Sequence, residues 1–409
     1  MIKLLIIGIR MDRGGTEKAL LSFLNGLPPS MVHVDLLLAI QDGPLLEEIP
    51  PYVHLLPPMK NGILFSWSRQ NALSVYRQLS FRGKNTFFSR HADLVYQTMR
   101  GVNGAGDRLF ATLMNEACLL FSEEYPERTY DAALAFSGDR TMFYLCDKVC
   151  CHTKIAWLHF DYRFPRRDDV LYESYFRQCR GILSVSNACT DLLKHQFPHL
   201  ADRFITFYNS IPLDNIVSMS QECISFPDSS FQGFRVLSVM RICYQKGVDR
   251  IPFILKRCRE AGWPLRWYIV GDGHPKEIRK LYRMAVRCGV QDQLILLGGL
   301  QNPYPLMKAC DLFVLPSRFE GMPITVEEAK LLAAPILCTN YLSAKEQLEN
   351  GRLGMICEES VDAITSSIQF LLKNAEVRRE YRNRLSCLSH KTDRIANKFL
   401  ALLANVKKM

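Results

Sequence analysis

Residues 234–262 have the sequence FRVLSVMRICYQKGVDRIPFILKRCREAG, which predicts a strand, a turn and then a helix. Apolar residues dominate 234–240, and those that follow recur at helical spacing, namely Val248, Ile251, Ile254, Leu255 and Cys258. Residues 3–27, KLLIIGIRMDRGGTEKALLSFLNGL, repeat the order of strand, turn and helix. Two such openings indicate that each half of the chain begins its own α/β domain.

The remainder of each half alternates short apolar segments with amphipathic ones. In the second half the apolar segments are LRWYIVG, LILLGG, DLFVLP and PILCTN; in the first half they are VHVDLLLAI, AALAFS, KIAWLH, GILSVS and FITFYNS. Regular alternation of this kind indicates parallel sheets covered by helices. The chain is therefore predicted to be an α/β protein with two domains.

Breaks in these patterns predict the domain boundaries. Residues 214–232 are polar, contain Pro227 and lack sustained periodicity, which favours an interdomain linker. We therefore expect the first domain at 1–213 and the second at 233–388. A helix within 389–409 has one apolar face and is expected to pack back on the first domain.

Length and composition exclude several classes of protein. The chain has 409 residues, of which 48% are hydrophobic and 22% charged, so it is neither disordered nor fibrous and is long enough for two or three domains. No run approaches the roughly 18 apolar residues that a membrane-spanning helix needs. The amino-terminal MIKLLIIGI is short and lacks a small-residue cleavage site, so we expect a first strand rather than a signal peptide.

The cysteines and the net charge indicate which cellular compartment and which kinds of binding partner to expect. The 14 cysteines form no C-x-x-C pair, which favours free thiols in a reducing cytoplasm over a zinc ribbon or a redox dithiol. The 51 basic residues exceed the 41 acidic ones by 10. This excess favours anionic partners, whether nucleotide phosphates, anionic lipid or nucleic acid.

Glycines follow the first predicted strand. Gly14 and Gly15 precede a helix, where a backbone can approach a phosphate or sugar closely, although an ordinary tight turn uses glycine equally well. No G-x-G-x-x-G is present, because the runs that begin at Gly104 and Gly271 lack the third glycine. The main sequence signature of dinucleotide-dependent oxidoreductases is therefore absent, which argues against that class of enzyme.

Two cations flank the turn after residues 234–240. Arg241 and Lys246 would both reach the carboxyl edge of a parallel sheet, which is the usual ligand crevice of such folds, and together they suit a diphosphate. Taken alone, two basic loop residues are more often solvated charges.

The segment 318–334, RFEGMPITVEEAKLLAA, adds two carboxylates. Glu320 and Gly321 end a loop, Pro323 suits a first helical turn, and Glu328 lies about two turns beyond Glu320. Carboxylates accept paired hydrogen bonds from vicinal hydroxyls, as on a ribose or a hexose. The alternative is an acidic first turn and a solvated helix face, the reading that we give to Glu327.

These motifs together resemble those of a known family. FEGMPITVEEA looks like the E-x7-E motif of the family 4 retaining glycosyltransferases, and it follows RICYQKG, IVGDG and LLGG in the family's order. The resemblance covers most of residues 233–360. In the first half it is looser and rests on Gly14-Gly15, WLHFD, LSVSNAC and YNSIPLD. It implies the GT-B architecture, in which two Rossmann-like domains face each other across a cleft.

The resemblance also implies roles for individual residues. Arg241 and Lys246 would bind the donor diphosphate, and Glu328 would bind the ribose. The transferred sugar would be held by Glu320 with the backbone of Gly321 and Met322. Further donor contacts would come from Gly14, Gly15, Gly271 and Gly299, and His159 would lie near the anomeric carbon, although a lone histidine after an apolar strand is more often structural.

The sequence departs from the family pattern at two places. Met240 stands where glycine usually precedes the arginine, and Leu300 stands where an aromatic residue often follows the glycine, which puts base contact and donor identity in doubt. No D-x-D occurs, so we expect no metal or other cofactor and assign the leaving-group charge to Arg241 and Lys246.

The leading hypothesis is a retaining hexosyltransferase that moves a hexose or N-acetylhexosamine from a nucleotide-sugar, expected to be UDP-linked, to a hydroxyl of a growing, lipid-linked, cell-surface glycan. A nucleotide-sugar epimerase of the same architecture and a non-catalytic nucleotide-sugar or glycan-binding protein are the alternatives. Donor isomerisation without acceptor would favour the former, and binding without turnover the latter.

One basic stretch suggests where the acceptor is met. Residues 59–112 contain eight basic and two acidic residues, interleaved with large aromatics that include Phe65, Trp67 and Tyr76. This mixture suits an anionic leaflet, and we expect peripheral association with the cytoplasmic face of a membrane. The alternative is a helix pair that packs its aromatics within the first domain. Nucleic acid is not expected, because no binding motif accompanies the charge.

Overall fold

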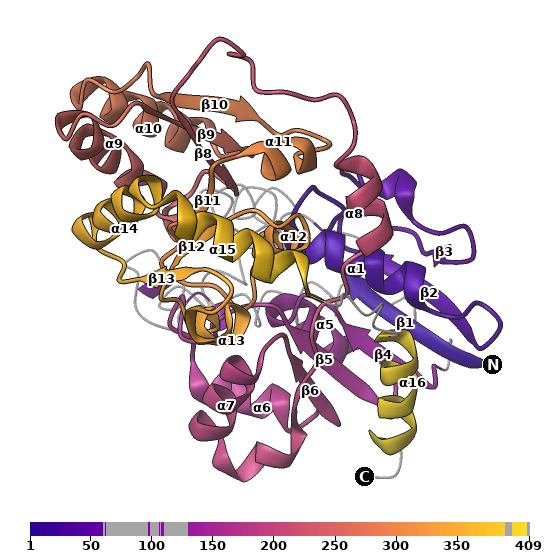
Figure 1. Ribbon diagram of the computed structural model, residues 1–409. Coiled ribbons are helices and arrows are strands. Elements are labelled where there is room, and N and C mark those ends of the chain that lie inside the picture. The colour runs from indigo at the N-terminus through magenta and orange to yellow at the C-terminus, as the bar shows by residue number, and fades with distance from the viewer. Residues whose placement is uncertain are drawn as a thin grey trace, which may run out of the picture. The chain divides into compact units, whose positions relative to one another are not determined.

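The computed structural model describes residues 1–59, 62, 97–98, 106, 108–109, 130–388 and 395–406. The chain forms two compact units (Figure 1). The first comprises Met1–Ser210 with Arg394–Met409, and the second comprises Ile211–Asp393. Most of the basic stretch 59–112 lies outside the described residues.

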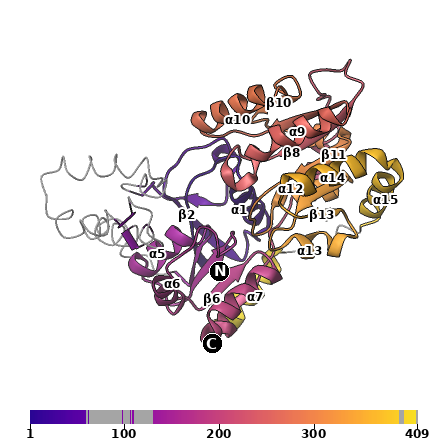
Figure 2. The ribbon, with the colours of Figure 1, turned by 90° about the vertical axis from the view of Figure 1, so that its left-hand side faces the viewer.

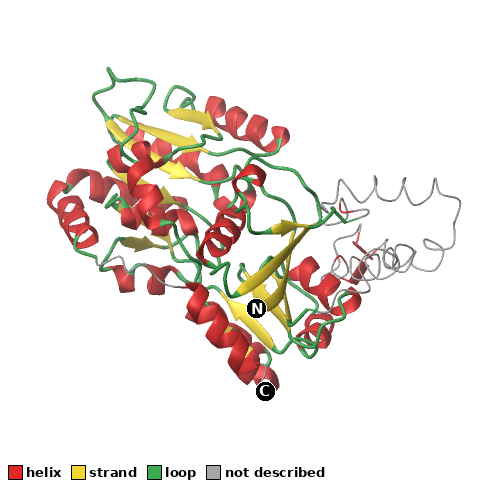
Figure 3. Cartoon of the chain, turned by 90° about the vertical axis from the view of Figure 1, so that its right-hand side faces the viewer, coloured by secondary structure: helices red, strands yellow, loops and turns green. Residues whose placement is uncertain are grey.

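The described part of the first unit contains seven strands, and every neighbouring pair is parallel. Their order across the sheet is β3 (His54–Leu55), β2 (Val32–Leu38), β1 (Ile2–Gly8), β4 (Ala132–Ala135), β5 (Lys154–Leu158), β6 (Gly181–Ser184) and β7 (Phe204–Thr206). The helices are α1 (Gly15–Gly26), η1 (Leu46–Glu48), α5 (Asp139–Lys148), α6 (Asp169–Phe176), α7 (Asn187–Gln196), η3 (Pro198–Arg203) and α16 (Ile395–Val406). Figure 3 shows helices flanking the strands.

Aromatic packing holds α1 and α16 against the first sheet. Phe23 of α1 is fully buried, and its ring centroid lies 5.0 Å from that of Phe399 of α16 and 5.5 Å from that of Trp157 of β5. Phe399 also packs edge-on against Phe207. Edge-to-face pairs of this kind add to the burial of apolar area. The carboxy-terminal helix is therefore part of the first unit.

The second unit, as far as the structure describes it, contains six parallel strands. Their order is β10 (Leu294–Gly298), β9 (Leu265–Val270), β8 (Phe234–Val239), β11 (Leu312–Leu315), β12 (Ile336–Thr339) and β13 (Met355–Cys357). The helices are α8 (Leu213–Met219), η4 (Tyr244–Lys246), η5 (Val248–Arg250), α9 (Ile251–Glu260), α10 (Pro275–Arg287), α11 (Tyr304–Ala309), α12 (Ile324–Leu331), α13 (Ala344–Gln347), η6 (Glu349–Gly351), α14 (Val361–Lys373) and α15 (Ala375–Ser386). If the six strands are numbered by their order along the chain, their order across the sheet is 3-2-1-4-5-6, which is the Rossmann arrangement.

A buried polar link fixes the centre of the second sheet. Ser238 of β8 accepts a hydrogen bond from the indole Nε1 of Trp267 (2.9 Å) and donates to the carbonyl of Val314 (2.5 Å). Buried polar groups are tolerated when they are paired in this way. The link ties β8 to both of its neighbours, so the loops that leave these strands start from fixed positions.

The segment expected to be an interdomain linker, 214–232, belongs to the second unit. Ile216 of α8 and Phe226 are buried in that unit's core, and the carboxylate of Asp228 accepts a hydrogen bond from Tyr268 (2.6 Å). The sequence pattern missed this because the segment is anchored by single long-range contacts rather than by a periodic apolar face. Among the residues that the structure describes, no helix is long and apolar enough to cross a membrane.

Candidate functional site

The loops at the carboxyl edge of the second sheet carry most of the predicted site residues. Arg241 and Lys246 follow β8, Gly271 follows β9, Gly299 follows β10, and Glu320 follows β11. The carboxyl ends of parallel strands lie at the same edge of a sheet. Arg241 and Glu320, which are 79 positions apart in sequence, therefore both lie at this edge. This edge is where ligands bind in open α/β sheets.

Lys246 and Glu320 form an ion pair. Nζ of Lys246 lies 2.5 Å from Oε1 of Glu320, and the two side chains are 14% and 7% exposed. Gln245 supports the loop that carries Glu320. Its Nε2 donates a hydrogen bond to the carbonyl of Phe319 (3.0 Å) and lies 3.4 Å from Oε2 of Glu320. The pair therefore presents a cation and an anion from two loops at nearly fixed positions.

The loop that carries Lys246 is held against the loop that carries Glu320. Arg318 donates two hydrogen bonds to the carboxylate of Asp249 (2.7 and 2.8 Å) and one to the carbonyl of Tyr244 (2.7 Å), and its guanidinium lies 3.8 Å from the centroid of the Tyr244 ring. Burial alone would raise the pKa of Asp249, but the hydrogen bonds from Arg318 outweigh it and lower that pKa below its usual value.

Gly247 permits the close approach of these two loops. Its φ of +68° is left-handed, and a Cβ there would lie 2.0 Å from the carbonyl oxygen of Pro316. Only glycine meets both conditions without strain. The glycine after Lys246 is thus a structural requirement of the site.

Arg241 provides a cation that remains available to a ligand. Its side chain is exposed, and it has no hydrogen-bond or ion-pair partner among the described residues. Met240, the residue before it, is buried with 5% exposure and fills the place where the family usually has glycine. The two predicted phosphate ligands thus differ, because Lys246 is already paired and Arg241 is not.

The two glycines of the neighbouring loops pack tightly. A Cβ on Gly271, whose φ is +141°, would lie 2.0 Å from the carbonyl oxygen of Met240, and a Cβ on Gly299 would lie 2.1 Å from Oδ2 of Asp272. The N–H of Gly299 donates to Oδ1 of Asp272 (3.1 Å). Both glycines therefore allow the loops to meet. Asp272 also takes part, although no sequence motif had pointed to it.

Glu328 lies in the second turn of α12, eight positions beyond Glu320 in the preceding loop. It is 1% exposed, and its Oε1 accepts a hydrogen bond from the hydroxyl of Tyr304 on α11 (2.9 Å). Between the two carboxylates, Gly321 is buried and Met322 is partly buried. The arrangement holds an oriented carboxylate, which is the group that hydrogen-bonds vicinal hydroxyls most readily.

Glu327 does not lie on a solvated face, contrary to the expectation. Its carboxylate lies 2.9 Å from Nζ of Lys330 and accepts a hydrogen bond from Nε2 of Gln347 (2.9 Å), a side chain that is 1% exposed. Glu327 therefore ties α12 to α13. Residues at i and i+3 of a helix are neighbours, so the Lys330 contact is local, whereas Gln347 arrives by the tertiary fold.

His159 follows β5 in the first unit. Both of its ring nitrogens are buried, although the residue keeps partial exposure, and its ring centroid lies 4.6 Å from that of Phe136 and 5.0 Å from that of Trp157. Burial lowers the pKa of His159 to about 3. The imidazole is therefore neutral at physiological pH and can act through hydrogen bonds but not as a cation.

Gly14 and Gly15 lie at the carboxyl end of β1, also in the first unit. Gly15 is the first residue of α1, and Gly14 precedes it with an ordinary φ of −91°. A Cβ on Gly14 would lie 2.1 Å from Oε2 of Glu17, so the space over this turn is occupied by a carboxylate.

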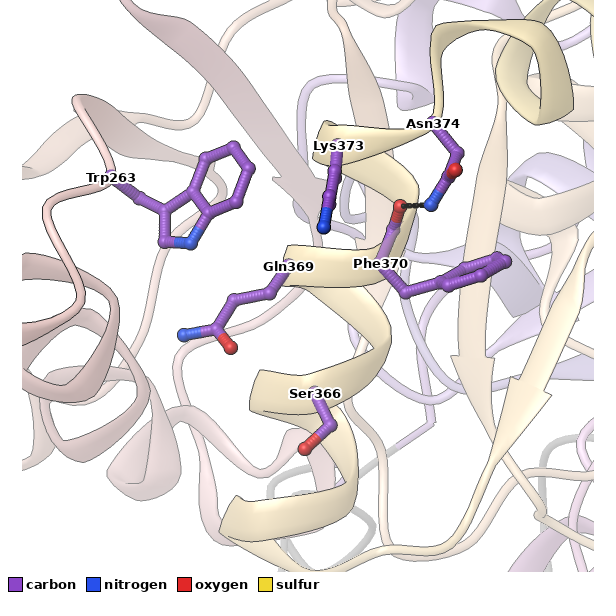
Figure 4. Close-up of a pocket in the computed structure, with 6 residues that line it drawn as sticks. All are labelled: Trp263, Ser366, Gln369, Phe370, Lys373 and Asn374. Carbon is purple, nitrogen blue, oxygen red and sulfur yellow. Dashed lines mark hydrogen bonds between the residues drawn. The ribbon is translucent and has the colours of Figure 1, made fainter.

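A surface pocket lies elsewhere in the second unit. It is lined by Trp263, Ser366, Gln369, Phe370, Lys373 and Asn374, and it contains none of the predicted site residues. Figure 4 shows Gln369 turned toward the side of Trp263, and Phe370 turned away. We assign the candidate site to the loops at the sheet edge instead, because charged and oriented groups gather there.

In the described ranges, no group of three or more His, Cys, Asp or Glu side chains could hold a metal ion.

Comparison with known proteins shows what the chain is similar to. Residues 229–386 match the model of the family described as glycosyl transferases group 1. The chain is 25% identical over 190 residues to an N-acetylgalactosamine-N,N'-diacetylbacillosaminyl-diphospho-undecaprenol 4-alpha-N-acetylgalactosaminyltransferase of Campylobacter jejuni, a match that covers 46% of this chain and 49% of the relative. It is 31% identical over 101 residues to a UDP-Gal:alpha-D-GlcNAc-diphosphoundecaprenol alpha-1,3-galactosyltransferase of Escherichia coli, covering 24% and 26% of the two chains.

The fold also matches that of solved structures over nearly the whole chain. The structure of Anabaena HepE in complex with UDP superimposes with a TM-score of 0.65 and covers 99% of this chain and 100% of its own, at 15% identity. The matches to curated relatives span less than half of those proteins' length. The fold is therefore GT-B, with two Rossmann-like domains. Residues 229–386, which are less than half of the chain, are similar to the group 1 glycosyltransferases.

Proposed function

We propose that this protein is a retaining, metal-independent glycosyltransferase that moves a hexose or N-acetylhexosamine from a nucleotide-sugar to a hydroxyl of a lipid-linked glycan. The observation that carries the proposal is the Lys246–Glu320 pair at the carboxyl edge of the second sheet, close in sequence to the exposed Arg241. A diphosphate needs cations, and a sugar needs oriented carboxylate and backbone groups. The edge supplies both.

The donor would be bound from the leaving group inward. Arg241 would reach the diphosphate first, because no described residue competes for it. Lys246 would share its charge between Glu320 and the phosphate. Glu328 would accept hydrogen bonds from the ribose hydroxyls, and Glu320 with Gly321 and Met322 would hold the sugar.

In the transfer step, the bond from the acceptor oxygen to the anomeric carbon forms while the bond from that carbon to the phosphate oxygen breaks. The electron pair of the breaking bond leaves with the nucleoside diphosphate, whose phosphate oxygen accepts the proton of the incoming hydroxyl. Arg241 and Lys246 stabilise the charge that develops on the leaving group. Neutral His159 would orient the sugar without supplying or removing a proton.

Two lines of similarity support UDP and a lipid-linked acceptor as the first reactants to test. HepE was solved with UDP, and the E. coli relative is named for UDP-Gal. Both curated relatives are named for acceptors that carry a diphospho-undecaprenol group. We propose the same classes of donor and acceptor here.

The test is incubation of purified protein with a panel of labelled UDP-, GDP- and ADP-sugars and a lipid extract, read by mass spectrometry and by NMR of the anomeric proton. We expect a lipid-linked product with the anomeric configuration of the donor. An inverted product would refute the retaining mechanism. An isomerised donor sugar in the absence of acceptor would indicate an epimerase instead of a transferase. Donor binding without any product would indicate a binding protein.

A further inference from the structure

Helix α10 (Pro275–Arg287) has a cationic outer face. Its basic side chains are all exposed, namely Lys276, Arg279, Lys280, Arg283 and Arg287, against the single acidic residue Glu277. At 3.6 residues per turn these five positions fall within a sector of about 100°. The buried residues Leu281 and Ala285 lie on the opposite side, toward the core. Figure 2 shows α10 beside α9 at the periphery of its unit.

The cations of α10 form no ion pair with any described residue. Nε of Arg283 donates a hydrogen bond to the carbonyl of Arg279 on the same helix (3.3 Å). Exposed charges on a helix are commonly balanced by neighbours three or four residues away. On α10 that balance is missing.

Two other basic helices of the same unit show the usual balance. On α9, Arg259 pairs with Asp292 (2.6 Å) and Lys256 with Glu260 (3.8 Å). On α15, Arg379 pairs with Glu376 and Arg384 with Glu380, while Arg382 donates to the carbonyl of Cys310 (2.8 Å). The basic side chains of α9 and α15 thus have partners, whereas those of α10 pair with no acidic side chain in the described part of the chain.

Exposed apolar side chains border the cationic sector. Tyr282 is 55% exposed and Val286 49% exposed, and both fall between the cations and the buried side of the helix. A helix that lies in a membrane interface has this composition, with Lys and Arg toward the headgroups and aromatic or aliphatic residues at the acyl boundary. A nucleic-acid backbone would use the cations but would leave Tyr282 and Val286 in water.

We propose that the outer face of α10 is a docking surface for an anionic lipid membrane. The helix is about 20 Å long, so several lipid headgroups can lie along it at once. Each cation near an anionic leaflet raises the partition coefficient about fivefold. This inference rests on the proposed function for its biological use, which is to keep the enzyme beside a lipid-linked acceptor, but the binding itself needs no donor or acceptor.

The test compares two variants with equal change in net charge. In the first, Lys276→Glu, Lys280→Glu and Arg283→Glu reverse the α10 face. In the second, Lys308→Glu, Lys345→Glu and Lys373→Glu reverse exposed lysines on α11, α13 and α14. Flotation of the full chain is measured with neutral phosphatidylcholine vesicles and with vesicles that contain about a third anionic lipid. Thermal unfolding and UDP binding by calorimetry show that each variant is folded.

We expect the wild type to bind anionic vesicles only, the α10 variant to lose about 100-fold or more in partitioning, and the second variant to change by less than about fivefold. Tyr282→Ser should weaken binding at fixed charge. Equal binding by the α10 variant and the wild type would overturn the proposal, as would equal loss in both charge variants. Binding of the wild type to RNA but not to vesicles would assign the surface to nucleic acid instead. UDP binding is read separately, so failure of the donor site would leave this result interpretable.

Discussion

Lys246 and Glu320, 74 residues apart in sequence, form an ion pair of 2.5 Å between the loops that follow β8 and β11. Because Glu320 already pairs with Lys246, a donor phosphate bound as we propose would share this cation rather than meet it free. The pair also holds both side chains in place without a ligand. Fixed charges of this kind stabilise a developing charge without reorganisation during the reaction.

Lys246→Ala should lower kcat/KM for transfer by about 100-fold or more, since it removes a cation from the leaving group. It should also cost about 1–3 kcal/mol in the free energy of unfolding, because it leaves the nearly buried carboxylate of Glu320 without its cation. Steady-state kinetics and urea denaturation measure the two effects. The control is Lys256→Ala, which removes an exposed lysine paired with Glu260. Near-wild-type transfer by Lys246→Ala would remove Lys246 from the mechanism.

Gly247→Ala and Gly262→Ala form a matched pair of substitutions. Both glycines have left-handed φ values, +68° and +77°, so alanine costs roughly 1–2 kcal/mol at either position. Only at Gly247 would the Cβ also collide with Pro316, while nothing lies within 4 Å at Gly262. We expect Gly247→Ala alone to lower transfer at least tenfold by displacing the Lys246 loop, as measured by kinetics. Equal activity of the two variants would show that the loop tolerates the shift.

Tyr304→Phe should weaken binding of the nucleoside diphosphate about tenfold, because it removes the hydrogen bond that orients Glu328. The effect should appear in the donor KM and in the calorimetric Kd, with little change in kcat. The exposed Tyr282 on α10 provides the control substitution Tyr282→Phe. An unchanged Kd for Tyr304→Phe would mean that Glu328 needs no support from α11.

His159 should make stability depend on pH. Burial lowers its folded pKa to about 3, below the ordinary value of 6.5. Below pH 6.5 the unfolded chain therefore binds a proton that the folded chain does not, and stability falls as pH drops from 6.5 toward 3, by up to about 1.4 kcal/mol per pH unit. His159→Phe should flatten this slope in urea denaturation at pH 7.5, 6 and 5. The exposed His195→Phe should leave the slope unchanged, and a wild-type slope in His159→Phe would contradict the assignment.

Transfer should survive excess EDTA, because Arg241 and Lys246 are expected to carry the charge of the leaving group without a divalent ion. The measurement is the initial rate with and without chelator after removal of free metal. Complete loss of activity that manganese or magnesium restores would show that a metal takes part.

Strong local patterns determined the fold class. The two strand-turn-helix openings at 3–27 and 234–262 predicted two α/β domains, because alternation of buried strands and amphipathic helices is visible within a short window. The E-x7-E spacing of Glu320 and Glu328 likewise lies within one loop and the start of the helix that follows it. These are local relationships, which a sequence records directly.

Relationships between distant residues were decided by the tertiary structure. The ion pair of Lys246 with Glu320, the support of Glu328 by Tyr304 and the burial of Ile216 all join segments whose order along the chain says nothing of their distance in space. The same holds for the unpaired cations of α10. Its sequence resembles other basic helices, and only the fold shows which cations have an acidic neighbour, because pairing depends on the side chains that packing brings within a few ångströms.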